Sequence, residues 1–597
     1  MMAFDEVDGR QSFNKEHRPL KPRYILRICP NLISLDTGYG ESLESGHDEQ
    51  TDAEMGLGDI DGEVRLAHFS VKTYLTSAEI KNSKASAFSV RESSAHLLMA
   101  EVCLTYLLQF NQNVFSLQKV LREFPMAPYA ARYWYRHSSI TSEDPNWGKV
   151  RLLIRKLLND KEKYFENWCQ VSDPDRAQPR IYRRRGNDAR GSPLYYASLL
   201  GLFEIVEDIL EDLEKTKNKT EINAEGGSFG NALQAACAQG NTKVVNLLLA
   251  KDAAVNNEGG FFGTALQAAC YNGRKDIVDI LLSRNANVNA NMGNFGTALQ
   301  AASLQGHKAI VQALLDKNAD VNIVGGEYWT SLQAAASQTS SSLGFATDMH
   351  MSDAKPMITY ANTSQRHRSV CEMLIDRGAD VNVSYGGNHG TALEAASYSG
   401  SEDIACMHLD KHADVNGRAG DLHNPLQTAA YRGHREIVYI LLSRGARIND
   451  GVGVHGNALQ AASFRNHVSI VNRLLEWNPP ASIDSKSRDG ETALHWAAMF
   501  GDLDLAKSLL RNDSDPNRAS RATEMDDHGW TPALLSWIYQ RGSDIQKLLL
   551  EAAGLSSWTS FGSPPSRLIK ALDCSGMSVG PDGWTANLGE TCNSSLR

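Results

Sequence analysis

The sequence lacks the residue patterns on which several kinds of protein chemistry depend. Its 597 residues include nine cysteines but no Cys-x-x-Cys pair, no His-Glu-x-x-His motif and no Cys/His cluster, so no metal site is expected. Its one Gly-Lys pair, Gly148-Lys149, is followed by Val150 and lacks the glycine five residues earlier that a phosphate-binding loop needs. Nucleotide hydrolysis therefore has no site in this chain. We expect no catalytic, cofactor-binding or metal-binding residues and no small-molecule substrate.

Long apolar segments are missing as well. No run of about 20 apolar residues could cross a bilayer, and the first residues, MMAFDEVDGRQ, lack the basic start and apolar core of a signal peptide. The net charge of −10 argues against nucleic acid as the main partner, and scattered cysteines suit a reducing compartment. These features predict an intracellular protein without membrane contact, in the cytoplasm or alternatively in the nucleus.

The sequence does contain a strict repeat. The phrase Gly-Asn/Thr-Ala-Leu-Gln-Ala-Ala occurs at 230–236, 263–269 and 296–302, with its leucines 33 residues apart. A fixed period of this size is typical of a solenoid, in which each unit covers the apolar face of its neighbour. The column of leucines predicts about ten repeats, at Leu194, Leu233, Leu266, Leu299, Leu332, Leu393, Leu426, Leu459, Leu494 and Leu534.

Each repeat carries the signals of two helices and a turn. The Gly-Thr/Asn pair can cap the first helix, Ala-Ala keeps that helix thin, and a glycine such as Gly273 ends it. Apolar pairs at 277–278 and 281–282 mark one face of a second helix. The Ala-Asn/Asp-Val-Asn segments, as at 286–289, indicate a turn that leads to the next unit.

At this point the residues resemble a known family. The segment Gly490–Gly501, which reads Gly-x-Thr-Ala-Leu-His-Trp-Ala-Ala-x-x-Gly, is similar to the ankyrin repeat, and the resemblance covers about 190–550. It implies paired helices with projecting hairpin fingers and protein binding on a concave side. Most units have Gln where the family usually has His, as at Gln234, Gln267 and Gln300, and His495 keeps the family residue.

The region before Arg190 lacks the period. It indicates a strand and then a helix capped by Ser70 within Glu63–Ser77, followed by helices at Ala95–Phe110, Pro128–Tyr135 and Val150–Leu158. The phrases LAHFSVKTYL, AEVCLTYLLQF, PYAARYW and SPLYYASLLGL together resemble the segment between the NTPase module and the repeats of fungal NACHT–ankyrin (NLR-like) receptors. That resemblance implies a winged-helix-like domain that leads through helices into the array.

We therefore predict a mainly α protein, an ankyrin-repeat α-solenoid preceded by a small winged-helix-like and helical region. The expected domains are 1–85 (winged-helix-like, with an acidic loop), 86–189 (helical linker), 190–555 (ankyrin array, with an insertion near 338–366) and 556–597 (Ser/Gly/Pro-rich tail).

One column of the repeat is the candidate binding site for a protein ligand. In ankyrin folds, the residue five places after the leucine looks into the concave groove, and aromatic residues there could anchor a partner. The alternative is that these side chains only stack on neighbouring repeats. The members of this column are Tyr271, Leu304, Tyr398, Tyr431, Phe464 and Met499.

The sixth repeat departs from the pattern. His408 occupies a position where the apolar face expects leucine, and His412 replaces the turn glycine. A buried neutral histidine without a partner costs roughly 1–3 kcal/mol. We expect this unit to be a weak seam in the array.

The leading interpretation of function is a non-enzymatic protein-interaction scaffold, the ligand-sensing or docking part of an intracellular fungal NLR-like protein. The chain would then be a short gene product or a partial gene model. The alternative is a fragment of an ATP-dependent signalling NTPase whose phosphate-binding module is encoded upstream. A repeat-containing enzyme with its active site within residues 1–180 ranks last, because no nucleophile and base pair can be defended there.

Overall fold

The computed structural model describes residues 92–109, 124–175 and 190–555, with internal gaps at 125, 140–146, 160–162, 338–359, 385–389, 419–423, 452–454, 512–517 and 540–542, and the backbone of short strands elsewhere. The chain divides into two units, Met1–Ala254 and Val255–Arg597.

Short antiparallel strand pairs lie near both chain ends. Strand β1 (Phe4–Val7) pairs with β2 (Arg10–Phe13), β3 (Ile33–Asp36) with β4 (Glu63–Leu66), and β5 (Ser578–Gly580) with β6 (Gly583–Thr585). Strand β4 begins where the sequence indicates a strand. The helix expected after Ser70, the acidic loop and most of the C-terminal tail lie outside the described residues, so the winged-helix-like domain stays an expectation.

Four of the described helices precede the repeats in the first unit. They are α4 (Glu92–Leu107), α6 (Ala127–Ser139), α7 (Trp147–Leu157) and α8 (Lys163–Val171). Helix α4 packs against α6 and α7. The rings of Trp134 and Trp168 are buried with their centroids 5.5 Å apart, and Trp168 Nε1 donates to the carbonyl of Ala131 at 2.9 Å. Helix α8 is the element of this region that the sequence patterns do not indicate.

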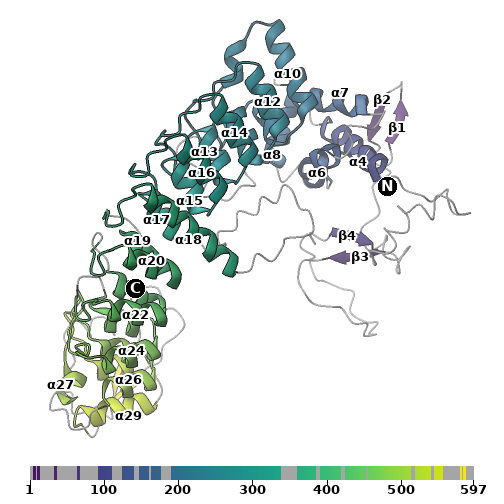
Figure 1. Ribbon diagram of the computed structural model, residues 1–597. Coiled ribbons are helices and arrows are strands. Elements are labelled where there is room, and N and C mark those ends of the chain that lie inside the picture. The colour runs from purple at the N-terminus through teal and green to yellow at the C-terminus, as the bar shows by residue number, and fades with distance from the viewer. Residues whose placement is uncertain are drawn as a thin grey trace, which may run out of the picture. The chain divides into compact units, whose positions relative to one another are not determined.

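The repeats are pairs of antiparallel helices, of which the described residues contain ten (Figure 1). The pairs are α9 (Pro193–Leu199) with α10 (Phe203–Lys215), α11 (Ala232–Gln239) with α12 (Thr242–Ala250), α13 (Ala265–Tyr271) with α14 (Lys275–Ser283), α15 (Ala298–Leu304) with α16 (Lys308–Asp316), α17 (Ser331–Ala336) with α18 (Tyr360–Asp376), α19 (Ala392–Ser399) with α20 (Glu402–Asp410), α21 (Pro425–Arg432) with α22 (Arg435–Ser443), α23 (Ala458–Phe464) with α24 (Val468–Glu476), α25 (Ala493–Phe500) with α26 (Leu503–Leu509), and α28 (Pro532–Ile538) with α29 (Ser543–Ala552). The short helices η4 (Lys219–Asn223) and α27 (Arg518–Thr523) lie in connections between repeats.

Local chemistry accounts for the boundaries of the first helices. The Asn231 side chain accepts from the backbone N–H of Gln234 at 2.9 Å and thereby caps α11. Helix α21 ends at Gly433, whose φ of +83° suits glycine, and a Cβ there would lie 2.6 Å from the ring of His467. Gly433 therefore ends the helix and also leaves room for the His467 ring of the next repeat.

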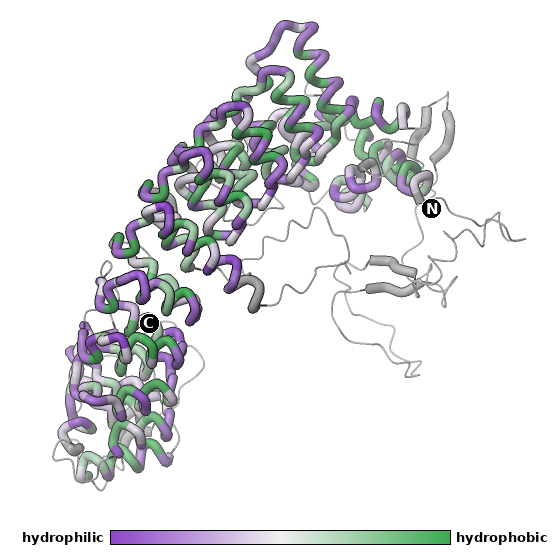
Figure 2. Tube along the Cα trace, in the orientation of Figure 1, coloured by the Kyte–Doolittle hydropathy of each residue, from purple (hydrophilic) through white to green (hydrophobic). Residues whose placement is uncertain are grey.

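The apolar pairs of the second helices form the core between repeats. In α14 the side chains of Ile277, Val278, Leu281 and Leu282 are all buried. Figure 2 shows hydrophobic stretches within the paired helices and hydrophilic stretches at many of the turns between them. This distribution is expected where neighbouring units bury one another's faces.

Two ladders of hydrogen bonds join successive repeats. The Asn289 side chain accepts from the backbone N–H of Asp320, one repeat further on, at 2.9 Å. In the second ladder, Gln427 Nε2 donates to the carbonyls of Asp450 and Gly456 at 2.7 and 2.6 Å. These bonds explain the final Asn of the Ala-Asn/Asp-Val-Asn motif and the Gln of the repeated phrase. Further asparagines make the first type of bond at Asn256, Asn322, Asn382, Asn416 and Asn449.

In the first unit, the helical region covers the first repeat. Phe165 and Trp168 of α8 pack edge-on against Tyr196 of α9, with ring centroids 5.5 and 5.6 Å away. The buried carboxylate of Asp175 accepts from Tyr195 Oη and from the backbone N–H of Ser228, both at 2.7 Å. These contacts bind the segment after α8 to both the first and the second repeat.

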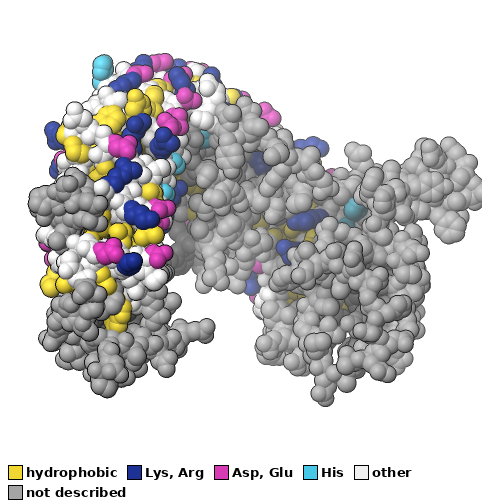
Figure 3. All heavy atoms as spheres, turned by 90° about the horizontal axis from the view of Figure 1, so that it is seen from below, with side chains coloured by type: hydrophobic (Ala, Val, Ile, Leu, Met, Phe, Trp, Pro, Cys, Tyr) yellow, Lys and Arg dark blue, Asp and Glu magenta, His cyan; other side chains and the backbone are white. Residues whose placement is uncertain are grey.

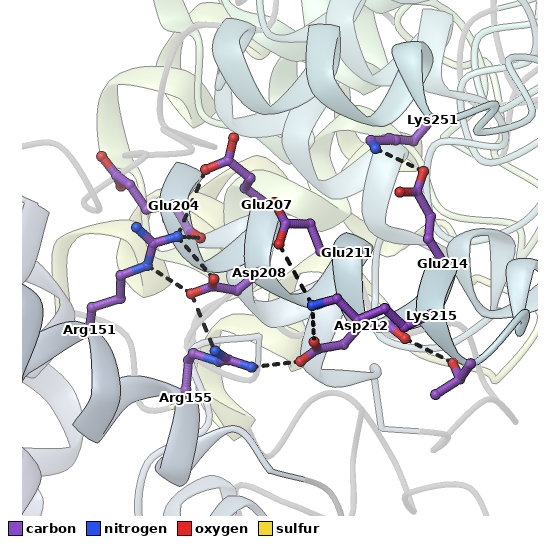
Figure 4. Close-up of polar contacts among 11 residues, drawn as sticks. Arg151, Arg155, Glu204, Glu207, Asp208, Glu211, Asp212, Glu214, Lys215 and Lys251 are labelled. Carbon is purple, nitrogen blue, oxygen red and sulfur yellow. Dashed lines mark hydrogen bonds and ion pairs between the residues drawn. The ribbon is translucent and has the colours of Figure 1, made fainter.

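An ion-pair network on the same unit connects α7 with α10 (Figure 4). Arg151 Nε lies 2.8 Å from Asp208, and Arg155 lies 2.6 Å from Asp212. The hydrogen bond to Asp208 raises the pKa of the Arg151 guanidinium. The pairs have one or both partners partly exposed, so their role is to orient α7 on the repeat more than to stabilise the fold.

The fifth and sixth repeats contain the irregular features that the sequence indicates. Helix α18 begins at Tyr360, so residues 360–366 of the expected insertion are helical, and 338–359 lie outside the described residues. His408 has no exposed surface, and neither of its ring nitrogens has a hydrogen-bond partner among the described residues. His412 adopts a φ of +64°, the left-handed conformation that glycine holds at Gly445.

Candidate functional site

The six residues of the candidate binding column all lie in the last turn of the first helix of a repeat. They belong to α13, α15, α19, α21, α23 and α25 in chain order, as Tyr271, Leu304, Tyr398, Tyr431, Phe464 and Met499. Because each first helix begins and ends at equivalent positions, the repeat brings one side chain per unit to this row.

Exposure divides the column into two parts. Tyr271 and Leu304 expose only 5% and 3% of their surfaces, whereas Tyr398 exposes 37%. Tyr431, Phe464 and Met499 are half-buried. A ligand can therefore reach the members from Tyr398 onward, and the earlier two contribute to packing in this conformation.

The buried part of the column is covered by a second column, four residues before each leucine. Tyr271 stacks on Phe295 with ring centroids 4.4 Å apart and meets Phe262 at 5.3 Å. Both phenylalanines are buried. Where the second column carries bulky Phe, the side chains of the first column are enclosed between neighbouring repeats.

The later repeats continue this stack but leave part of it open. His455 lies between Tyr431 and Phe464, with ring centroids 5.3 and 4.2 Å away. Phe464 also contacts Trp496 edge-on at 4.8 Å, and beyond it Phe500 exposes 43% of its surface. Trp496 and Phe500 belong to this surface although the sequence column did not include them.

Two arginines complete the surface. The guanidinium carbon of Arg432 lies 4.4 Å from the ring centroid of Tyr398, and that of Arg465 lies 4.7 Å from the ring centroid of Tyr431. Each arginine directly follows a column residue, in Tyr431-Arg432 and Phe464-Arg465, at the repeat step of 33. The recurrence of arginine directly after the column residue could have predicted this part of the surface from the sequence. The candidate column predicted from the sequence did not include these arginines.

For several members of the column, a histidine from the following repeat holds the backbone beneath the side chain. The imidazole N–H groups of His434 and His467 donate to the carbonyls of Tyr398 and Tyr431, each at 3.1 Å. His307 makes the equivalent bond to the Tyr271 carbonyl at 3.2 Å. Burial lowers the pKa of His307 and His434. These bonds fix the last turn of one first helix to the next repeat and so preorganise the row.

Metal-ligand clusters and the nucleophile elbow are two arrangements that a reactive centre can use. No group of three or more metal-ligating side chains occurs within the described parts of the chain. The residues Gly226–Gly230 match the Gly-x-Ser-x-Gly pattern, but they follow the 3₁₀ helix η4 and not a strand, and the N–H of Ser228 is bound to Asp175. None of the described helices has the length and apolar character needed to cross a membrane. Figure 3 shows hydrophobic, basic and acidic side chains interspersed on the face in view.

Comparison with known protein families agrees with the helix pairs. Models of ankyrin repeats match residues 194–292, 357–452 and 458–557, and a single ankyrin repeat matches 296–326, together more than half of the chain. The chain belongs to the ankyrin-repeat family, and the expected mainly α solenoid is confirmed.

A curated relative comes from a fungus. The azaphilone pigments biosynthesis cluster protein L of Monascus ruber is 38% identical over 256 residues, which are 42% of this chain and 50% of that protein. The chain thus spans about half the length of the curated relative that it matches.

Proposed function

We propose that this chain is a non-enzymatic scaffold that binds another protein through the exposed part of the column, centred on Tyr398, Tyr431 and Phe464. Ankyrin repeats support a role in protein–protein interaction, because the family presents a surface and not a reaction centre. The observation that carries the proposal is the exposure of Tyr398 and Phe500, 37% and 43%, on a row that hydrogen bonds to the next repeat hold in place. Large aromatic side chains on a rigid row suit the anchors of an interface.

Two cellular contexts fit this role. The resemblance of the N-terminal phrases to fungal NACHT–ankyrin proteins supports a ligand-sensing or docking part of an intracellular NLR-like receptor. The name of the Monascus relative supports an alternative, in which the chain would dock proteins of a pigment biosynthesis cluster. A further alternative is that the chain is a fragment of an ATP-dependent signalling NTPase. Full-length transcripts that encode a phosphate-binding loop upstream of Met1 would support that alternative.

The binding role is tested by affinity capture with the full chain as bait. We compare the wild type with Tyr398→Ala, and use Tyr439→Ala as the matched control, because Tyr439 exposes 44% of its surface on the second helix α22. Quantitative mass spectrometry should find proteins that the wild type and Tyr439→Ala retain and that Tyr398→Ala loses about tenfold or more, the usual loss at an interface anchor.

Thermal melting of the same three proteins tests whether a loss of capture is caused by unfolding. Tyr398 is more than a third exposed, so its truncation should leave the melting temperature nearly unchanged. If the captured proteins do not depend on Tyr398, or if nothing is captured, the proposed function is wrong.

A further inference from the structure

The two arginines of the surface repeat an arrangement that the proposed function does not itself require. Arg432 covers the ring of Tyr398, and Arg465 covers the ring of Tyr431, each from one repeat further along the chain. Together with Phe464 and Phe500 these residues form what we call the arginine–aromatic row: Tyr398, Tyr431, Arg432, Phe464, Arg465 and Phe500.

The residues that the structure describes do not neutralise the charges of this row. Among the described residues, no carboxylate oxygen lies within 4.0 Å of Arg432 or Arg465, although both side chains are exposed. Two other exposed arginines of the same unit are paired: Arg377 lies 3.0 Å from Asp316, and Arg444 lies 2.8 Å from Asp410. The row therefore presents two positive charges that are available to a ligand.

The guanidinium groups are also held in position. The carbon of each guanidinium group lies over a tyrosine ring, and Arg432 Nε also donates to the Tyr398 carbonyl at 3.3 Å. The terminal amino groups of Arg432 make no hydrogen bond within the described residues. A planar fork that is already ordered loses little entropy when it binds a carboxylate in a bidentate manner.

The ring faces argue against a nucleic acid as the ligand. Bases bind such surfaces by stacking on open aromatic faces. Here Arg432 lies over Tyr398, and Arg465 and His455 lie against Tyr431. His455 also stacks on Phe464 at 4.2 Å. What the row offers is guanidinium N–H groups and, at its end, the apolar surface of Phe500. Carboxylates and an apolar side chain match those groups.

We propose that the arginine–aromatic row binds an extended acidic segment of a partner protein, with one carboxylate on Arg432, another on Arg465, and an apolar side chain against Phe464 and Phe500. Packed helices lie about 8–10 Å apart, and an extended peptide advances about 3.3 Å per residue. Two carboxylates about three residues apart therefore span neighbouring repeats. This inference rests on the proposed function, because it names the chemistry of the partner for the same surface.

One acidic side chain, Asp502, limits the row at its far end. Asp502 follows Phe500 after one glycine, and it accepts from Asn466 Nδ2 at 2.8 Å and from the N–H of Leu505 at 2.7 Å. Its negative charge should exclude a third carboxylate there. The apolar residue of the ligand is thus expected beyond the second carboxylate.

The test uses the purified full chain and an array of short fluorescent peptides. Each peptide carries two Glu at separations of one to six residues and one Phe beyond the second Glu, and a matched set carries Gln in place of Glu. Fluorescence anisotropy should show the tightest binding at a separation of about three residues, weaker binding at high salt, and a large loss for the Gln set. A single-stranded oligonucleotide serves as the competing ligand.

Two double variants distinguish the effect of the arginine–aromatic row from the effect of overall positive charge. Arg432→Gln with Arg465→Gln should weaken binding of the best peptide about tenfold or more, as expected for lost charge-assisted hydrogen bonds. Arg377→Gln with Arg444→Gln removes the same charge elsewhere in the unit and should change affinity less than about twofold. Unchanged melting temperatures for both variants exclude misfolding as the cause.

Equal binding of the Glu and Gln sets, no binding of any acidic peptide, equal effects of the two double variants, or tighter binding of the oligonucleotide would overturn the inference. The proposed function is judged separately. If proteins are captured through Tyr398 but no acidic peptide binds, the proposed scaffold function is supported and the proposal of an acidic ligand is wrong.

Discussion

A single side chain, His408, shows how burial controls the chemistry of one repeat. The equivalent residues of other second helices are Leu281 and Leu441, which have no exposed surface, and His408 is equally buried. Burial lowers the pKa of its imidazole from near 6.5 to about 4, and no charged group contributes to the shift. The ring is therefore neutral at pH 7, and its two nitrogens are without hydrogen bonds among the described residues. Such a group costs stability without serving packing.

We expect His408→Leu to raise the free energy of unfolding by about 1–3 kcal/mol at pH 7, the penalty of a buried unsatisfied polar group. In the unfolded wild-type chain, His408 is protonated below about pH 6.5, whereas in the folded chain it is protonated only below about pH 4. The free energy of unfolding therefore falls as the pH drops from 6.5 to 4. His408→Leu should remove this contribution to the pH dependence of the free energy of unfolding. Urea titrations between pH 4 and 8 measure both effects.

The exposed His528 provides the control for His408→Leu. His528→Leu changes the same atoms where water can solvate them, so it should leave stability at pH 7 nearly unchanged. If His408→Leu lowers stability, the imidazole contributes to the fold through a contact that burial alone does not describe.

At the scale of elements, successive repeats are joined by side chains that donate hydrogen bonds to backbone carbonyls in the hairpin finger of the next repeat. Gln427 uses its amide to reach two carbonyls of the following repeat, and His495 donates to the Trp530 carbonyl at 3.0 Å. Helix α19 carries Glu394 at the equivalent position. Its Oε1 accepts from Thr428 Oγ1 at 3.2 Å, and its Oε2 has no partner within the described residues. A carboxyl group has no amide N–H of the kind that glutamine donates to the next repeat, and no such bond from Glu394 occurs within the described residues.

We expect Glu394→Gln to stabilise the chain most at alkaline pH. Burial raises the pKa of this carboxyl from 4.5 to about 8, so the folded chain binds a proton that the unfolded chain has lost. The stability contributed by the protonated group is complete below pH 4.5 and is lost as the pH rises through 8. Glutamine removes this loss and supplies an amide donor. The gain should be about 1–3 kcal/mol at pH 8.5 and smaller at pH 5, measured by chemical denaturation.

Glu402→Gln is the matched control, since Glu402 lies exposed in the first turn of α20. It should change stability by less than about 0.5 kcal/mol at either pH. A gain for Glu394→Gln that is the same at pH 5 and pH 8.5 would contradict the assignment to the buried proton.

The helix pairs and their caps could be predicted from the sequence because each is encoded within one period. Leu266, Gly273 and the apolar pairs recur at fixed spacing, and the buried position of His408 followed from the same register. The arginine–aromatic row was only partly predictable, because stacking of Arg432 on Tyr398 joins side chains from different repeats. The contact of Asp175 with Tyr195 and Ser228 was not predictable, since no period relates these residues.

At the scale of the whole molecule, a solenoid has ends whose apolar faces lack a neighbour. In the first unit the face of the first repeat is covered by α8 through Phe165 and Trp168. Asp175 adds hydrogen bonds from Tyr195 and Ser228. The region expected as a helical linker therefore covers the first repeat, within the same unit of the chain.

We predict that a fragment of residues 190–555 is less stable than one of residues 92–555. The shorter fragment exposes the ring of Tyr196 and leaves the Tyr195 hydroxyl without its buried acceptor, Asp175. Each buried polar group left unpaired costs about 1–3 kcal/mol, so the melting temperature should fall by several degrees. Binding of a hydrophobic dye should rise at the same time, because an apolar face has become accessible. The longer fragment, which keeps α4 to α8, should melt like the full chain in its repeats; equal melting and equal dye binding for both fragments would show that the repeats need no cap.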